Sequence, residues 1–400
     1  ELNLLLRGEP DTTFMPPADD LPDNIQYVLT LDADTRLPRD SARQLIGKLA
    51  HPLNMPVVDA KTGRVTEGYG LLQPRVTPSL TTGDEASPFQ RIFSKDRGLD
   101  PYVFAVSDLY QDIFHEGTFT GKGLYHVDAF AASMEGRIDE NTVLSHDLLE
   151  GSFARCGLAT DVTFVEDFPI RYEVEMSRQH RWARGDWQLL AYILDFGNHL
   201  AALSRLKMLD NLRRSLVPQM WIAASILGWL MLSAPAAALW QLVLIVSYFS
   251  PAIVTLFLGI APRQVGVAPQ RHLLTLLEDA VDTMAQIGLR LAFMADNAVS
   301  MTDAIVRTIY RLTVSRRRLL EWRTAHDVHS SAKPEGLIGY YRMMAISLVA
   351  TIVIYALVML IDPTNAFIAG VLSLIWLVAP ALAWWVSQSL ENEDRLDVAP

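Results

Sequence analysis

The sequence is poor in cysteine and in net positive charge. Its one cysteine, Cys156, excludes a disulfide within the chain and suits a reducing compartment. Lys and Arg number 34 against 45 Asp and Glu, so the formal net charge is −11, and no cluster of basic and aromatic residues indicates nucleic-acid binding. This balance argues against a general nucleic-acid-binding protein, which needs basic surface to neutralise phosphates. We therefore expect no nucleic-acid partner.

An initiator methionine and a signal peptide are also missing. The first residues, Glu1-Leu-Asn-Leu-Leu-Leu, read as the tail of a helix that closes at Gly8, and a connector rich in Pro and Asp follows at 9–24. We interpret the chain as an internal piece of a longer polypeptide, whose remaining domains are among its expected partners.

Apolar residues, in contrast, are abundant: 50% of the chain is hydrophobic and the mean hydropathy is +0.18. Four runs approach the ~20 residues that a bilayer core requires: 216–234, 237–260, 342–361 and 366–389. We expect two pairs of transmembrane helices; the alternative is a buried hairpin of a soluble protein. The short turns within the pairs lack Lys and Arg, whereas the opposite ends carry many, so the positive-inside rule places the N-terminal half in the cytoplasm.

These runs divide the chain into four regions. Residues 1–200 form an α/β domain, 201–260 an interface helix and two transmembrane helices, and 341–390 two further transmembrane helices. Between the pairs, 261–340 is too charged to span a membrane, but its Leu and Met residues recur at helical spacing. This pattern predicts amphipathic helices at the cytoplasmic face of the lipid bilayer.

The most informative stretch of the α/β domain is Tyr27-Val-Leu-Thr-Leu-Asp-Ala-Asp. Residues 27–31 predict a short buried strand, which ends in Asp32 and Asp34. Ligands of open α/β sheets bind beyond the carboxyl ends of strands, and two carboxylates there can hold Mg²⁺ or Mn²⁺ on a diphosphate. An ordinary turn is the alternative. A helix is expected from Pro38 to Ala50, capped by Thr35 or Asp40, and the next strand at 68–77.

Two further motifs follow. Thr120-Gly-Lys-Gly combines backbone freedom with one ammonium group, which suits close approach to a sugar or a phosphate, although a glycine-rich turn is the alternative and the P-loop spacing is absent. Ser145-His-Asp begins a helix predicted to run to Gly157, with Ser145 as the N-cap. Asp147 then lies in the first turn, where the helix dipole favours the ionised carboxylate, and it is a candidate general base.

The last motif is Arg178-Gln-His-Arg-Trp-Ala-Arg-Gly, followed by Gln188. At helical spacing Arg178, Arg181 and Gln188 lie near one side, with Trp182 beside them. Arginines can clamp a leaving diphosphate, and an indole face can stack on a sugar ring. The alternative is a basic helix at a membrane surface.

Taken in order, these four motifs resemble the membrane-embedded, processive GT-A glycosyltransferases of the cellulose synthase and hyaluronan synthase type. The sequence departs from that pattern where His146-Asp147 replaces Glu-Asp and Arg178 replaces Gln. With Ser145-His-Asp-Leu-Leu-Glu-Gly and Arg316-Arg-Arg-Leu-Leu-Glu-Trp, these departures are similar to the cyclic β-1,2-glucan synthases. The resemblance covers nearly the whole chain.

The resemblance implies a GT-A-like α/β domain, partial because its N-terminal nucleotide-binding part is missing, followed by an all-α transmembrane region. It also implies an inverting glucosyltransferase of the bacterial inner membrane that transfers glucose from UDP-glucose to a growing β-1,2-glucan acceptor. Asp147 would be the base, Asp32 and Asp34 the metal ligands, and the substrate would contact Gly121, Lys122, Gly123, Arg178, Gln179, Arg181 and Trp182.

Two alternatives stay open: a synthase of another β-linked polysaccharide on the same scaffold, and a catalytically inactive membrane scaffold subunit. Because only 31 residues precede Asp32, too few for the strand–helix units of a uridine pocket, we expect the isolated piece to be inactive. The strand before Asp32 should then lie at an exposed edge of the sheet.

Overall fold

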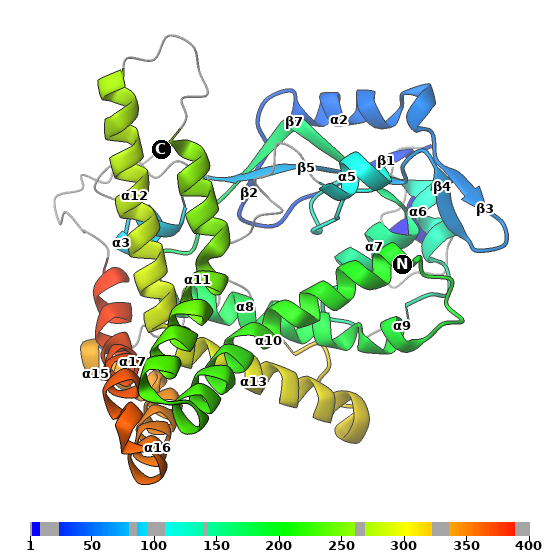
Figure 1. Cartoon of the computed structure of the whole chain (residues 1–400). Helices are drawn as coiled ribbons and strands as arrows, with labels where there is room; N and C mark the ends of the chain where they lie inside the picture. Colours follow the sequence, from blue (N-terminus) through cyan, green and yellow to red (C-terminus); the bar gives the residue numbers. More distant parts are fainter. Residues whose placement is uncertain are drawn as a thin grey trace.

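The computed structural model describes residues 2–8, 24–79, 86–94, 109–138, 142–260, 269–321 and 336–388. These residues form a mixed α/β part followed by a helical part, as expected (Figure 1). The first helix, α1 (Leu2–Leu6), ends before Gly8, whose positive φ of 81° closes it as the sequence predicts. The connector expected at 9–24 lies, apart from Asn24, outside the described residues.

The main sheet contains five strands within the described ranges. Their spatial order is β1 (Tyr27–Thr30), β6 (Gly123–His126), β5 (Leu71–Pro78), β7 (Cys156–Glu166) and β2 (Thr35–Arg36). Strands β5 and β7 pair in parallel, and the other three pairs are antiparallel. The edge position expected for β1 is confirmed. The expectation that it is buried is wrong, because an edge strand has one neighbour and all four of its residues stay partly exposed.

Side chains that alternate along the strands give the sheet two apolar faces. On β5, Leu72 and Val76 pack with Leu45 and Leu49 of α2 (Ser41–Leu49). The neighbouring Leu71 points the other way and belongs to a second cluster with Phe119, Tyr125 and Cys156. The buried Cys156 is thus a packing residue. A smaller sheet of β3 (Val57–Asp59) and β4 (Arg64–Glu67) lies beside the main one (Figure 1).

Three local predictions need correction. The helix α2 begins at Ser41 rather than Pro38, with Asp40 at its N-cap position, and the strand expected at 68–77 spans Leu71–Pro78. The helix expected to reach Gly157 is α7 (Asp147–Phe153), and its N-cap position belongs to His146 rather than Ser145. It ends early because Cys156 already pairs with Leu71, so the chain must turn into β7. Cross-strand pairing of this kind is non-local and overrides the local pattern.

The remaining elements are mostly helical. Short ones in the first half are η2 (Pro52–Asn54), α3 (Pro88–Phe93), α5 (Leu109–Phe114) and α6 (Val127–Met134). The second half comprises α8 (Tyr172–Gln188), α9 (Leu190–Leu194), α10 (Ala202–Met231), α11 (Ala234–Gly259), α12 (Pro269–Ala292), α13 (Met294–Tyr310), η4 (Arg311–Ser315), α15 (Gly336–Met343), α16 (Ala345–Ile361), η5 (Pro363–Asn365) and α17 (Ala366–Val386).

Two described helical stretches are long and apolar enough to cross a membrane: Ala234–Val254 within α11, and Pro363–Val386, which joins η5 to α17. A third qualifies if α15 and α16, bent by 63°, count as one span. The first of the four predicted runs, 216–234, lies mostly in the C-terminal half of α10, and its crossing stays a prediction. The helices expected between the pairs are α12 and α13.

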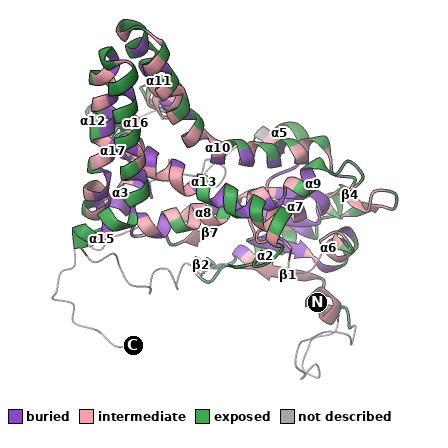
Figure 2. Ribbon diagram, turned by 90° about the horizontal axis from the view of Figure 1, so that it is seen from below, coloured by how far each residue is buried: buried purple, intermediate pink, exposed green. Residues whose placement is uncertain are grey.

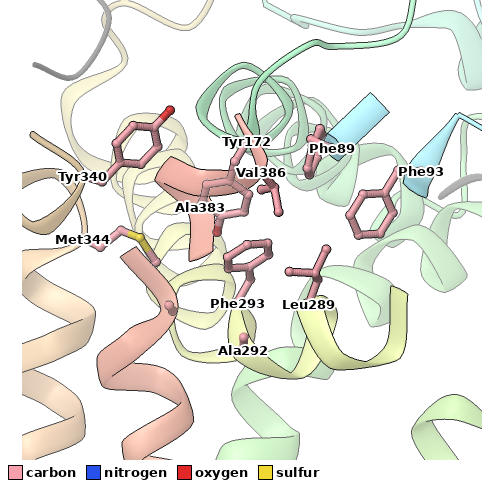
Figure 3. Close-up of a cluster of buried hydrophobic side chains, with 11 residues drawn as sticks. Phe89, Phe93, Tyr172, Leu289, Ala292, Phe293, Tyr340, Met344, Ala383 and Val386 are labelled. Atoms are coloured by element: carbon pink, nitrogen blue, oxygen red, sulfur yellow. The ribbon is translucent and has the colours of Figure 1, made fainter. Parts of the chain in front are cut away.

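An aromatic cluster joins the two halves (Figure 3). Phe89 and Phe93 of α3 meet Tyr172 at the start of α8 and Phe293 between α12 and α13. The rings of Tyr172 and Phe293 lie 4.2 Å apart. Tyr340 of α15 and Val386 of α17 complete the cluster. The beginning of α8 is therefore anchored among the helices of the second half.

Candidate active site

The first group of the candidate site consists of three carboxylates at one end of the main sheet. Asp32 and Asp34 lie in the turn that follows β1, and Glu166 ends β7, where it pairs with Thr35 of β2. One oxygen of each carboxylate lies within 4.8 Å of the others. Burial and the charge of Glu166 raise the pKa of Asp34 above its ordinary value. The repulsion among three negative groups at this spacing favours a bound cation.

The ammonium of Lys122 lies against this group. Its Nζ is 2.8 Å from an oxygen of Glu166 and 3.1 Å from an oxygen of Asp32, and the side chain is buried. Burial alone would lower the pKa of Lys122, but the charges of Glu166 and Asp32 outweigh it and raise that pKa. The side chain therefore stays an ammonium ion, and the sequence-predicted Asp32 and Lys122 are direct partners.

Close backbone contacts hold Lys122 in place. The buried side chain of Gln73, on β5, accepts hydrogen bonds from the backbone N–H and the hydroxyl of Thr120 at 2.9 and 3.1 Å. A Cβ added to Gly123 would lie 2.1 Å from the carbonyl oxygen of Leu72, so only glycine fits where β6 meets β5. The Thr120-Gly-Lys-Gly stretch is consequently fixed to the sheet on both sides of Lys122.

The candidate base, Asp147, lies beside the same stretch. A Cβ built on Gly121, whose φ is 89°, would be 3.0 Å from Oδ2 of Asp147. Burial and the charge of Glu150 raise the pKa of Asp147 to about 6. A carboxylate with that pKa is ionised at neutral pH yet binds a proton more readily than an ordinary Asp, which suits a general base.

Asp147 belongs to a second ionisable group with His146 and Glu150, one turn further along α7. Nδ1 of His146 is 2.7 Å from Oε1 of Glu150. This hydrogen bond to Glu150 raises the pKa of His146. Glu150, a residue without a role in the sequence prediction, therefore acts on both neighbours: it favours the imidazolium of His146 and disfavours the carboxylate of Asp147.

The helix α8 packs directly on the segment that carries the base. A Cβ on Gly185 would lie 2.8 Å from Cβ of Ser145, so this glycine permits the close approach. Three residues after Gly185, Gln188 accepts a hydrogen bond from the backbone N–H of Leu144 at 2.6 Å. Gly185 of the predicted motif thus has a role in packing.

Arg181 of α8 faces the carboxylates of the site. Burial lowers its pKa, while the charges of Asp32, Asp34 and Asp147 act in the opposite direction. Arg181 therefore lies close enough to the two aspartates after β1 and to the candidate base for their charges to act on it. The structure therefore brings together motifs separated by about 150 residues of sequence.

Arg178 and Gln179 are directed elsewhere. Both contact Glu175, which is buried one turn earlier: Nη2 of Arg178 at 2.7 Å and Nε2 of Gln179 at 2.8 Å. The guanidinium of Arg178 also lies 4.8 Å from the ring centroid of Trp182. Trp182 itself remains 41% exposed and so retains free ring surface. The substrate contacts assigned to these three residues stay predictions.

Two of the acids in the site, Glu150 and Glu166, were missing from the sequence prediction. For Glu166 a signal existed, since it follows Val162-Thr-Phe-Val as Asp32 follows its own apolar run. Glu150 stands three residues after Asp147, where helical spacing places it on a nearby face.

The carboxylates of Asp32, Asp34 and Glu166 fit a Mg²⁺ or Mn²⁺ ion in chemistry and in spacing, because such hard cations prefer oxygen ligands. Around them the described residues provide an ammonium in Lys122, a guanidinium in Arg181 and a separate carboxylate in Asp147. Together these groups can bind an anionic diphosphate on one side and remove a proton on the other.

Comparison with known proteins agrees with the resemblance described in the sequence analysis. The chain is 58% identical over all its 400 residues to the cyclic beta-(1,2)-glucan synthase NdvB of Rhizobium meliloti (strain 1021). The resemblance predicted from the motifs is confirmed. The chain spans 14% of the length of that relative. No family model matches the chain.

Proposed function

We propose that this chain is the catalytic and membrane-attached portion of an inverting glucosyltransferase that extends a β-1,2-glucan from UDP-glucose at the bacterial inner membrane. The observation that carries the proposal is the convergence of Asp32, Asp34, Lys122, Asp147 and Arg181 at one end of the sheet. The name of the relative supports the product, and the order of the motifs supports a GT-A-like domain.

Each group has a role in this reaction. Asp32, Asp34 and Glu166 would hold Mg²⁺ or Mn²⁺, and the ion when bound would neutralise charge on the donor diphosphate. Asp147 accepts the proton of the acceptor hydroxyl while the hydroxyl oxygen forms a bond to the anomeric carbon of the donor glucose. The bond from that carbon to the diphosphate breaks at the same time. Lys122 and Arg181 stabilise the negative charge that develops on the departing UDP. Attack opposite to the leaving group inverts the anomeric configuration.

The helical half supplies the membrane anchor and the acceptor side. The apolar C-terminal half of α10 and the helices α11, α16 and α17 cross the inner membrane as two pairs, so that the α/β part and α13 both face the cytoplasm, where UDP-glucose is available. Trp182 offers its exposed indole face to the acceptor sugar beside Arg178 and Gln179. The lipid bilayer, the glucan acceptor and the other domains of the longer polypeptide are thus its partners.

The test is a transfer assay with membranes that contain the full-length protein. Radiolabelled UDP-glucose and Mn²⁺ are supplied, and the linkage of the labelled product is determined. A β-1,2-linked glucan that depends on Asp147 supports the proposal. A β-linked product with another linkage would show that the scaffold makes a different polysaccharide.

The inactive-scaffold alternative predicts a different outcome in the same assay. Membranes would incorporate no label from UDP-glucose, and substitution of Asp147 would change nothing. The charged residues argue against that alternative, because a scaffold has no need to bury Lys122 between Asp32 and Glu166 or to keep a base with a raised pKa.

A further inference from the structure

Lys122 occupies part of the place that the proposed cation requires. Its ammonium contacts Asp32 and Glu166, and these are two of the three carboxylates whose oxygens lie within 4.8 Å of one another. A divalent ion held by the same three carboxylates would compete with the ammonium for the same oxygens. Both positive groups cannot keep their full contacts at once, because like charges at this distance repel strongly.

We propose that Lys122 is a resident counter-cation that a divalent ion displaces from Asp32 and Glu166, and that the displaced ammonium then pairs with the donor diphosphate. This inference rests on the proposed function and adds that binding of the divalent ion and binding of the nucleotide affect each other. Without nucleotide, Lys122 neutralises the carboxylates and weakens ion binding. With nucleotide, the diphosphate offers the ammonium a new partner, so ion and UDP strengthen each other's binding reciprocally.

The surroundings of Lys122 limit its movement to the side chain. Gln73 fixes Thr120, and the close contact of Gly123 with Leu72 fixes the following residue. The backbone of Lys122 is thereby held, and the four-carbon stem can carry the ammonium only to points near the end of the sheet. Glu166 is the residue that positions the ammonium in the absence of nucleotide, since its contact at 2.8 Å is the shorter of the two.

The experiment measures Mn²⁺ binding to the full-length protein in detergent, from the paramagnetic resonance signal of free Mn²⁺, with and without UDP. In wild type, UDP should raise the affinity for Mn²⁺ about tenfold or more. In Lys122→Gln, nucleotide-free Mn²⁺ binding should tighten about tenfold, and the enhancement by UDP should fall to about twofold or less. Lys122→Arg keeps the positive charge and should stay close to wild type without UDP.

Lys48→Gln is the matched control. Lys48 also pairs with a carboxylate on β7, Asp161, at 2.8 Å, but belongs to α2, and its loss should leave both Mn²⁺ affinities unchanged. Glu166→Gln removes one carboxylate and should weaken Mn²⁺ binding in both conditions. Melting curves of each variant establish that it is folded.

Failure of this inference and failure of the proposed function give different results. If wild type and Lys122→Gln bind Mn²⁺ with equal affinity in the absence of nucleotide, the inference about Lys122 is wrong. The proposed metal site would still stand in that case if Asp34→Asn abolished Mn²⁺ binding. The inference would also be wrong if UDP did not change the Mn²⁺ affinity of the wild-type protein. If no Mn²⁺ binds even with UDP, the metal role in the proposed function is itself wrong.

Discussion

The sheet half and the helical half of this protein differ in how many large apolar side chains they expose. In the sheet half Leu45, Leu71 and Phe164 are completely buried. In the helical half many large apolar side chains point outward, with Leu360 and Phe367 each 82% exposed, and exposed colouring covers much of α11 (Figure 2). Water would disfavour such a surface, whereas lipid tails do not, so the contrast supports a membrane around the second half.

Charged residues differ between the halves as well. At the end of the sheet they form the candidate site, with Lys122 and Asp147 among carboxylates. In the helical half, buried polar groups chiefly connect elements: the hydroxyl of Tyr172 donates to Asp296 at 2.9 Å, and Nη1 of Arg184 donates to the carbonyl of Glu321 at 2.8 Å. Both residues belong to α8, which also touches Ser145. We infer that the helical half positions the helix on which the chemistry of the sheet half depends.

The largest expected effect is that of Asp147→Asn. Removal of the base should lower turnover of the full-length protein by about 10²–10⁴-fold, while UDP and Mn²⁺ binding stay near wild type, because the metal carboxylates are untouched. Transfer assays and calorimetry measure the two quantities. Asp34→Asn is the complementary variant and should instead weaken Mn²⁺-dependent UDP binding. If Asp147→Asn kept most of its turnover, Asp147 would have only a structural role at the start of α7.

The second prediction concerns the contact between the halves. Gly185→Ala should displace Ser145 and the base after it, and we expect turnover to fall by about tenfold to a hundredfold. Gly47→Ala, in α2, is the matched control because its added Cβ meets open space; it should leave turnover unchanged and stabilise the helix by about 0.5–1 kcal/mol. Equal turnover in Gly185→Ala and Gly47→Ala would show that the close packing of α8 on Ser145 is not needed for catalysis.

A smaller effect is expected from the neighbour of the base. The raised pKa of Asp147, about 6, predicts that kcat/KM of wild type falls as the pH drops through about 6, since the proton blocks the base. The charge of Glu150 raises that pKa more than the charge of His146 lowers it, so Glu150→Gln should move the acidic limb to lower pH. The measurement is a pH profile for both proteins. A limb that moves to higher pH would contradict this assignment.

The last prediction tests the orientation and should not change turnover. The buried Cys156 should give a low labelling background in variants of this chain that carry one added cysteine. In intact cells whose outer membrane is permeabilised, an impermeant thiol reagent should label cysteine at position 234 or 364, between paired helices, and spare position 300 in α13. Labelling at 300 would place the sheet half outside and contradict a cytoplasmic supply of UDP-glucose.

Local patterns sufficed for several elements of the fold. The strand before Asp32, the helix that carries Arg181 and Trp182, the closing of α1 at Gly8, and the apolar stretches in α11 and α17 follow from residues adjacent in sequence. Hydrophobic periodicity and the residues that begin or end a helix involve only a few neighbouring positions, so they can be recognised in a single sequence. No strand is predicted at 156–166: the apolar run Val162-Thr-Phe-Val is short, and the full length of β7 depends on pairing with β5, more than 80 residues earlier.

For the site, the sequence by itself determined the kinds of chemical group and their order: two aspartates, a lysine between glycines, a helix-starting aspartate and an arginine–tryptophan helix. Only the tertiary structure decided their partners. It placed Glu166 on Lys122, Glu150 beside Asp147, and Arg178 on Glu175 rather than among the carboxylates. The reason is physical: a side chain's charge and hydrogen-bonding capacity are properties of its own atoms, whereas distances of 3–5 Å between remote residues arise from strand pairing and helix packing.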